Sequence, residues 1–193
     1  MTIEIDDSGT GDLLGDAFIG FLRKETNQLL FKAIPLELFN EENWKNKVPF
    51  KKVVDIVKEG LKELNFDKNK EKINLCRGNF FDNVRAYFNE EGINFDNIAI
   101  EGKLQDAVEE KYISHLRDLG VRSNKLTKES GAKRYFVLFN WLCYDFYNRE
   151  KHVKCGFKKW NTVWREQAIK NYEKINTTKG PKRSACNRTN TPK

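Results

Sequence analysis

The amino-acid sequence predicts an α/β fold, a mixed five-stranded sheet with helices on its faces and a helical C-terminal extension. The first observation is the order of hydrophobic patterns, which gives β-β-β-α-β-α-β-α and then helices alone. The second is composition, because 39% hydrophobic and 12% aromatic residues in a 193-residue chain are enough for a buried core.

The first three predicted elements are strands. Residues 2–7 alternate apolar and polar side chains, as a half-buried strand does. Residues 17–22 are almost continuously apolar, which indicates a central strand. A polar turn separates them from a third strand at residues 29–34, which ends at Pro35. The short connection predicts an antiparallel hairpin.

Two more short strands, residues 73–76 and 97–100, alternate with three helices. Apolar residues recur at helical spacing over residues 47–64, from Phe80 to the glycine at position 92, and over residues 104–119. Glycines end the second and third of these helices, as is common at helix C-termini.

The chain is expected to have three parts. Residues 1–122 form the α/β core, and residues 123–175 form a basic, aromatic-rich helical extension packed on it. Within the extension, residues 133–148 predict a helix buried on more than one side, and residues 160–172 predict a last helix. Residues 176–193 have no large apolar groups and are expected to be a disordered basic tail.

Charge is distributed unevenly along the chain. Residues 1–120 contain 17 lysines and arginines against 23 acids, and residues 121–193 contain 18 against 5. A basic segment of this length attracts polyanions, which predicts DNA or RNA as a partner, although a solvated surface is the simpler alternative. Without a signal peptide or membrane-spanning run, and with four irregularly spaced cysteines, we expect a cytoplasmic protein with reduced thiols and no membrane partner.

Acidic residues stand where predicted strands end. Asp6 and Asp7 close the first strand, Asp82 follows the fourth, and Glu101 follows the fifth. Adjacent strands lie about 4.8 Å apart, so carboxylates at their ends can converge. Such a cluster needs a compensating cation, for which Mg²⁺ or Mn²⁺ with oxygen ligands is typical.

Two motifs resemble known nucleases. The element order and the sequence IDDSG at residues 5–9 resemble the ribonuclease H-like superfamily, including a group of its members that begin IDESG. The sequence NIAIEG at residues 97–102 is similar to the strand-ending glutamate of Holliday-junction resolvases. The resemblance covers residues 2–120 in topology and about a dozen residues in motif.

This resemblance implies a divalent-metal-dependent nuclease, a hydrolase of phosphodiester bonds in DNA or RNA. It assigns Asp6 and Glu101 as metal ligands, with Asp7 as a neighbouring ligand or on the opposite side. Asp82 and Asp106 are further catalytic candidates on this basis. Two bound cations would activate a water and stabilise the leaving oxygen.

The sequence departs from the family pattern in two places. The fourth strand ends in Cys76-Arg77 where an acid is normal, and two helices rather than one precede the strand with Glu101. The late acid expected on a C-terminal helix is left open among four residues, which are Asp106, Glu109, Glu110 and Asp145.

The basic half is expected to bind the nucleic-acid backbone and to stack on unpaired bases. The aromatic residues between 133 and 147 are more typical of a buried core than of a base-stacking surface. The predicted contacts are Lys133, Arg134, Lys154, Lys158, Lys159, Trp160 and Arg165, with Trp141, Phe157 and Trp164 as additional stacking candidates.

Other interpretations remain open at this point. IDDSG is also compatible with an ordinary turn, and residues 8–11 with a phosphate-binding loop. Glu101 and Asp82 are also compatible with acids that favour a helix N-terminus. A non-catalytic nucleic-acid-binding or adaptor protein is the main alternative, and a regulatory protein with an acidic partner is another. The residues Cys143, His152 and Cys155 also suggest a weak zinc-site hypothesis.

Overall fold

The fold is described by a computed structural model, which covers residues 1–126 and 131–178. Short 3₁₀ turns at Leu36–Phe39, Asn79–Phe81 and Glu150–His152 and a π-helical turn at Trp160–Trp164 supplement the main elements. In chain order these elements are β1 (Thr2–Ser8), β2 (Ala17–Arg23), β3 (Gln28–Ile34), α1 (Glu41–Lys45), α2 (Val48–Glu63), β4 (Lys72–Cys76), α3 (Asp82–Glu90), β5 (Phe95–Ile98), α4 (Lys103–Asp118), α5 (Ala132–Tyr144), α6 (Phe146–Arg149) and α7 (Arg165–Thr178).

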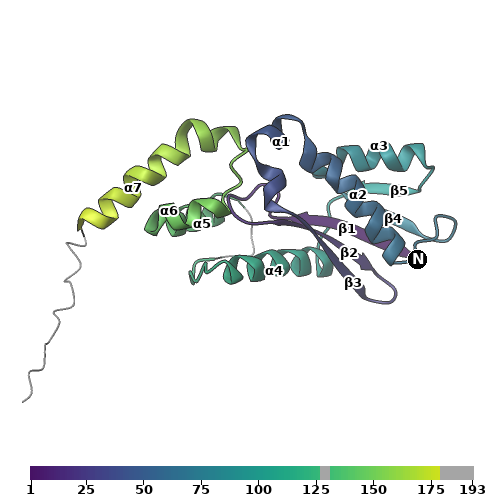
Figure 1. Cartoon of the computed structure of the whole chain (residues 1–193). Helices are drawn as coiled ribbons and strands as arrows, with labels where there is room; N and C mark the ends of the chain where they lie inside the picture. Colours follow the sequence, from purple (N-terminus) through teal and green to yellow (C-terminus); the bar gives the residue numbers. More distant parts are fainter. Residues whose placement is uncertain (127–130, 179–193) are drawn as a thin grey trace, which may run out of the picture.

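The five strands form one mixed sheet in the order β3-β2-β1-β4-β5. The β1–β2 and β2–β3 pairs are antiparallel, whereas β1–β4 and β4–β5 are parallel. This confirms the predicted α/β class and the five-stranded mixed sheet. It also makes β1 the central strand, whose C-terminal end lies between β2 and β4 (Figure 1).

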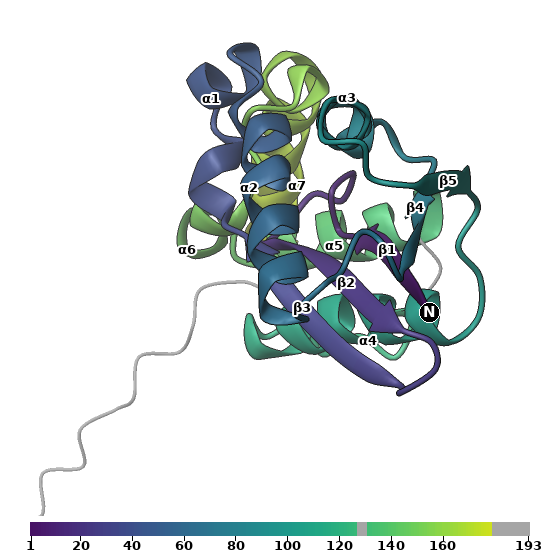
Figure 2. The same cartoon turned by 90° about the vertical axis from the view of Figure 1, so that its right-hand side faces the viewer.

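Helices cover both faces of the sheet. The helices α2 and α3 lie on one face and α4 lies on the other (Figures 1 and 2). The alternation of β1 explains this, because Ile3 and Ile5 pack into the core that includes Val53 of α2. On the other face, Gly20 lets α4 approach closely, since a Cβ there would lie 3.0 Å from Leu104.

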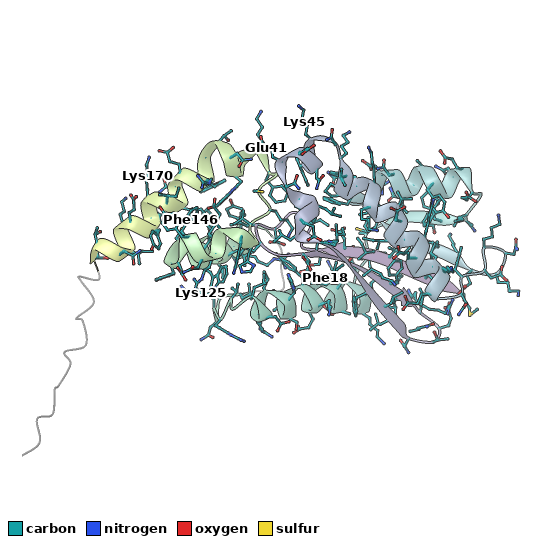
Figure 3. All side chains as sticks on the ribbon, viewed as in Figure 1. Phe18, Glu41, Lys45, Lys125, Phe146 and Lys170 are labelled. Carbon is teal, nitrogen blue, oxygen red and sulfur yellow. The ribbon has the colours of Figure 1, made fainter. Side chains whose placement is uncertain are left out.

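The α4 face joins a second hydrophobic core that belongs partly to the C-terminal extension. Phe18 of β2 and Phe146, the first residue of α6, both belong to this core (Figure 3). Leu13 and Leu14, from the loop between β1 and β2, are buried in the same core. The extension therefore packs against the loop that follows the central strand (Figure 1).

Several predicted boundaries were wrong. The fifth strand covers Phe95–Ile98, not residues 97–100, because its pairing with β4 ends where Cys76 pairs with Ile98. Ile100 is buried instead by packing beside Leu104, outside the sheet.

Corrections in the extension are smaller. The predicted helix over 133–148 is interrupted at Asp145, whose backbone is not helical. Residues 176–178, predicted to belong to the disordered tail, form the end of α7, and the rest of that predicted tail lies outside the described residues. Within the described residues, every helix is too short or too polar to cross a lipid bilayer.

Candidate active site

The C-terminal end of β1 carries a compact group of potential metal ligands. Asp6, Asp7 and Cys76 each offer one ligand atom, and these three atoms lie within 4.8 Å of one another. The parallel pairing of β1 with β4 brings them together, since Ile5 pairs with Leu75 directly before them. In the described part of the chain, no other histidine, cysteine or acid belongs to a group of this kind.

Asp6 is the buried member of the group, with 5% of its surface exposed. The thiol of Cys76 donates a hydrogen bond to its carboxylate, which partly offsets the effect of burial. Burial raises the pKa of Asp6, and the nearby Glu4 charge adds to this rise. The pKa of the Cys76 thiol is raised to about 12 by burial and by Asp6. Cys76 is therefore a neutral donor in the absence of a cation.

Asp7 faces a pocket and is held in place by the turn that follows it. The Thr10 hydroxyl donates to the Asp7 carboxylate at 2.5 Å. The turn requires glycine at position 9, where φ is +81° and a Cβ would lie 2.6 Å from the Tyr112 ring. Burial raises the pKa of Asp7 to about 6, and the charges of Asp6 and Glu109 contribute to the rise.

A pocket of about 620 Å³ opens at this end of β1. Asp7 and Ser8 line it from the strand, and Glu109 lines it from α4. Burial raises the pKa of Glu109, although Arg134 opposes the rise. The Ser8 hydroxyl is buried and makes no hydrogen bond of normal geometry, yet it lies near enough to Glu109 to lower the pKa of that carboxyl. The pocket lining thus combines three carboxyls, those of Asp7, Asp12 and Glu109, with an unsatisfied hydroxyl.

An arginine from α5 supports the wall of this pocket. Arg134 is fully buried and donates to both Asp12 oxygens, at 3.0 and 2.5 Å, and to Glu109 at 2.5 Å. Its guanidinium also lies 5.0 Å from the centre of the Tyr112 ring. Both acids raise the pKa of Arg134, so this charge stays fixed.

A lysine from the segment before the π-helical turn fixes the loop between β1 and β2. The fully buried Lys154 donates to the carbonyls of Gly9 and Leu14, at 2.9 and 3.0 Å. Burial lowers the pKa of Lys154 to about 7, and the charges of Asp12 and Asp16 partly counteract this. The C-terminal extension therefore holds the loop that presents Asp7.

The structure places three predicted catalytic acids apart from this group. Glu101 is exposed in the connection before α4, because β5 ends three residues earlier. Asp82 is exposed at the start of α3 and forms an ion pair with Arg85. Asp106 is exposed in the first turn of α4. None of the three joins Asp6 and Asp7 in the cluster of possible ligands.

Three of the predicted nucleic-acid contacts are buried. Arg134 and Lys154 are fully buried and bind groups of the protein itself, and Trp160 is 2% exposed within the second core. Sequence reasoning assigned them to the surface because it could not foresee that the extension covers the loop after β1.

The remaining predicted contacts are exposed. Lys133, Lys158 and Lys159 are all exposed, and Arg165 is exposed and bonded to Glu150. Lys159 and the partly buried Trp164 also line the pocket of about 620 Å³ at the end of β1, which we call the acidic pocket.

The zinc hypothesis finds no support among the described residues. Cys143 is buried beside Asn171, and the His152 ring lies 6.2 Å from that of Trp141. With Cys155 they do not form a group of ligand atoms close enough to hold a metal.

Sequence reasoning missed two members of the site and left a third open. Cys76 was treated as a departure from the family pattern, and Thr10 was not considered as a partner of Asp7. The spacing of Asp7 and Thr10 across a glycine is a signal that could have identified this contact. Glu109 was one of four acids left open, and only the packing of α4 on β1 distinguishes it.

Comparisons with known proteins do not identify the chain. No model of a known protein family matches it, and no curated protein sequence matches it significantly.

Proposed function

We propose that this protein is a divalent-metal-dependent nuclease that hydrolyses phosphodiester bonds of DNA or RNA on a ribonuclease H-like fold. The observation that carries the proposal is the pair Asp6-Asp7 at the end of the central strand, with Glu109 facing the same pocket. Among residues 1–126 and 131–178, no lysine or arginine forms an ion pair with either aspartate. A divalent cation is the simplest compensation for such a group.

The residues present fit a hard divalent cation. Asp7 would supply an oxygen donor at the pocket, whose lining also includes Glu109 and the unsatisfied Ser8 hydroxyl. Asp6 and Cys76 lie within 4.8 Å of Asp7 as further donors. The thiol favours Mn²⁺ over Mg²⁺, because Mn²⁺ tolerates sulfur better than Mg²⁺ does.

Each side chain then has a role that follows from its contacts. Asp7 would hold the cation, and Thr10 fixes the orientation of its carboxylate. Arg134 holds Glu109 in place at the pocket wall. The exposed Lys159 at the pocket contacts a phosphate of the substrate. When bound, divalent cations lower the pKa of a water and stabilise the leaving oxygen of a phosphodiester.

The element order supports the same assignment of fold. Three antiparallel strands followed by two helix-connected parallel strands give β-β-β-α-β-α-β, and α4 then packs on β1 and β2. This is the order on which the resemblance to the ribonuclease H-like superfamily rests, and it brings the acids to the central strand.

Cleavage of single-stranded and double-stranded DNA and RNA, in Mn²⁺, Mg²⁺ or EDTA, tests the proposal. We expect cleavage by the full chain in Mn²⁺ and none in EDTA. Asp7→Asn should reduce the rate at least about 100-fold, because a direct ligand matters more than outer partners, which are worth 10–100-fold. Asp55→Asn is the matched control, since Asp55 is exposed on α2. Equal rates for both variants would refute the proposal.

A non-catalytic nucleic-acid-binding protein on the same fold is the second candidate. It is favoured by the end of β4, where Cys76-Arg77 stands in place of an acid, and by the engagement of Glu109 with Arg134. Salt-sensitive binding without cleavage in any divalent metal would select this candidate over the first.

A further inference from the structure

We propose that an aromatic pocket beside the acidic one binds a single unpaired nucleobase of the substrate strand. This inference rests on the proposed function for the identity of the polymer, and it adds that the polymer is bound as a single strand. The pocket has a volume of about 450 Å³, which accommodates one base and is lined mainly by aromatic side chains.

One wall of the pocket comes from the core domain. Trp44 of α1 and Phe80 from the turn before α3 line it, with ring centres 6.2 Å apart. Phe157 from the extension packs edge-on against Trp44 at 4.9 Å. Phe50 stacks behind Phe80 at 4.3 Å and holds that ring in place. These rings pack against one another and form a preorganised surface for a flat ligand.

The other lining residues come from the extension. Tyr135 of α5 and Trp164 of the π-helical turn line the pocket, with ring centres 5.6 Å apart. The buried side chains of Leu13 and Trp160 also line it. The ligand would therefore contact aromatic rings from two parts of the chain that are far apart in sequence.

The aromatic pocket adjoins the acidic pocket. Thr10, Gly11 and Lys159 line both, as do Tyr135 and Trp164. Thr10 is the residue that donates to Asp7, so the two binding sites meet at the turn that holds the candidate metal ligand. A nucleotide can thus place its base among the rings while a neighbouring phosphate reaches Asp7.

The charge around the aromatic pocket favours a nucleotide over a purely apolar ligand. Lys158 and Lys159 line it and are exposed, which suits the phosphate groups on either side of a base. The exposed Asn79 lines it as well and offers an amide that can hydrogen-bond to a base edge. Stacked aromatics beside lysines are the usual combination for single strands.

A base inside a duplex cannot enter such a pocket, because it is already stacked and paired. The ligand must be single-stranded or have its base rotated out of the helix, at a cost of a few kcal/mol for an intact pair. The pocket therefore predicts a preference for single strands, loops or ends over uninterrupted duplexes.

Binding of a 2-aminopurine-labelled oligonucleotide to the full chain in EDTA tests this inference without cleavage. The fluorescence of this base falls when it stacks on another ring. We expect quenching of a single-stranded oligonucleotide on binding, with affinity at least about tenfold higher than for the same sequence in a duplex.

Variants at the rim make the test specific. A side chain at Gly11 would meet no atom within 4 Å of its Cβ, and the backbone there is not left-handed, so Gly11→Leu should fold normally and obstruct the opening. We expect Gly11→Leu to remove the quenching and to weaken single-strand binding about tenfold. Lys158→Ala should weaken binding, whereas Lys151→Ala, an exposed lysine outside both pockets, should not.

The outcomes separate this inference from the proposed function. Quenching by the wild-type chain that is lost in Gly11→Leu supports the base pocket, whether or not the wild-type chain cleaves nucleic acid in Mn²⁺. Binding without quenching, equal affinity for duplex and single strand, or no nucleic-acid binding at all would overturn it. Cleavage in Mn²⁺ with unchanged quenching in Gly11→Leu would leave the nuclease intact and overturn only the pocket.

Discussion

Two groups of charged side chains lie near the C-terminal end of β1, and the charges of their acids are compensated in different ways. In the first, Asp12 and Glu109 share the buried Arg134, with two bonds to one acid and one to the other. In the second, Asp6 and Asp7 are adjacent, and their partners are a thiol and a hydroxyl.

The contrast is the basis for proposing that the first group is structural and the second functional. Burial of charge is tolerated where an opposite charge with several hydrogen bonds compensates it. The Asp6-Asp7 pair has neutral donors only among the described contacts, and burial raises the pKa of both carboxyls. Carboxyls with raised pKa values at a pocket are typical of functional sites, where a bound ligand can compensate their charge.

Among the variants that test this contrast, the largest expected effect is slower cleavage by Glu109→Gln. Glu109 belongs to the Arg134 group and also lines the pocket that Asp7 lines. Removing its charge should lower the cleavage rate in Mn²⁺ about 10- to 100-fold, the range for groups that orient or support metal ligands. Glu90→Gln, at an exposed position on α3, is the control. If both variants retain the wild-type rate, Glu109 is a structural acid only.

The next effect concerns the paired group. Arg134→Ala leaves the Asp12 carboxylate buried without its guanidinium, and we expect it to lower the free energy of unfolding by about 3–5 kcal/mol. Urea denaturation measures this. Arg117→Ala is the matched control, since Arg117 and Glu110 form an exposed pair at 3.7 Å, worth about 0–1 kcal/mol. Similar losses in the two variants would remove the distinction between buried and exposed pairs.

In the Asp6-Asp7 pair, removal of a charge should raise the free energy of unfolding rather than lower it. The folded protein keeps the Asp7 proton to about pH 6, whereas the unfolded chain loses it near 3.8. The folded state thus binds more protons in this window, so the free energy of unfolding falls as pH rises through it. Asp7→Asn should therefore raise stability at pH 7.5 by about 1–3 kcal/mol and reduce this pH dependence.

Thermal or urea unfolding between pH 4 and 8 compares Asp7→Asn with the wild-type chain in EDTA. Asp55→Asn serves again as the control, with no gain expected. Destabilisation by Asp7→Asn at pH 7.5 would mean that the carboxylate is stabilised by its surroundings, and the comparison between the two groups would fail.

Lys154 is expected to have a smaller effect, on the pH dependence of the free energy of unfolding. Its folded pKa is about 7 against an ordinary 10.5, so between these values the unfolded chain binds more protons than the folded one. Stability attributable to this group should therefore rise with pH, by about 1 kcal/mol between pH 7 and 8. Lys154→Met should remove that rise in urea denaturation. An unchanged slope in the variant would show that Lys154 keeps its proton in the folded protein.

Much of the fold follows from local sequence patterns. The alternation in residues 2–7 and the apolar run at 17–22 predicted β1 and β2 to within one or two residues. The fifth strand was misplaced because Ile98 and Ile100 have the same pattern, although only Ile98 pairs with β4. Which apolar residue belongs to a strand and which to a neighbouring core depends on tertiary packing.

The candidate site was predictable only in part. Asp6 and Asp7 were recognisable from a strand that ends in two acids before a glycine turn. Glu109 lies near them because α4 packs on β1, and Cys76 lies near them because of the register in which β4 pairs with β1. Neither arrangement can be predicted from a local sequence pattern. The interior positions of Arg134 and Lys154 were missed for the same reason, since a cation in a basic segment looks like a surface residue until its acidic partners are located.

Binding of Mn²⁺, measured by calorimetry with the wild-type chain and with Asp7→Asn at pH 7.5, tests the central claim most directly. We expect saturable binding by the wild-type chain that is lost, or weakened at least about tenfold, in the variant, with normal binding by Asp55→Asn. Equal Mn²⁺ binding by all three proteins, or none by the wild-type chain, would contradict it.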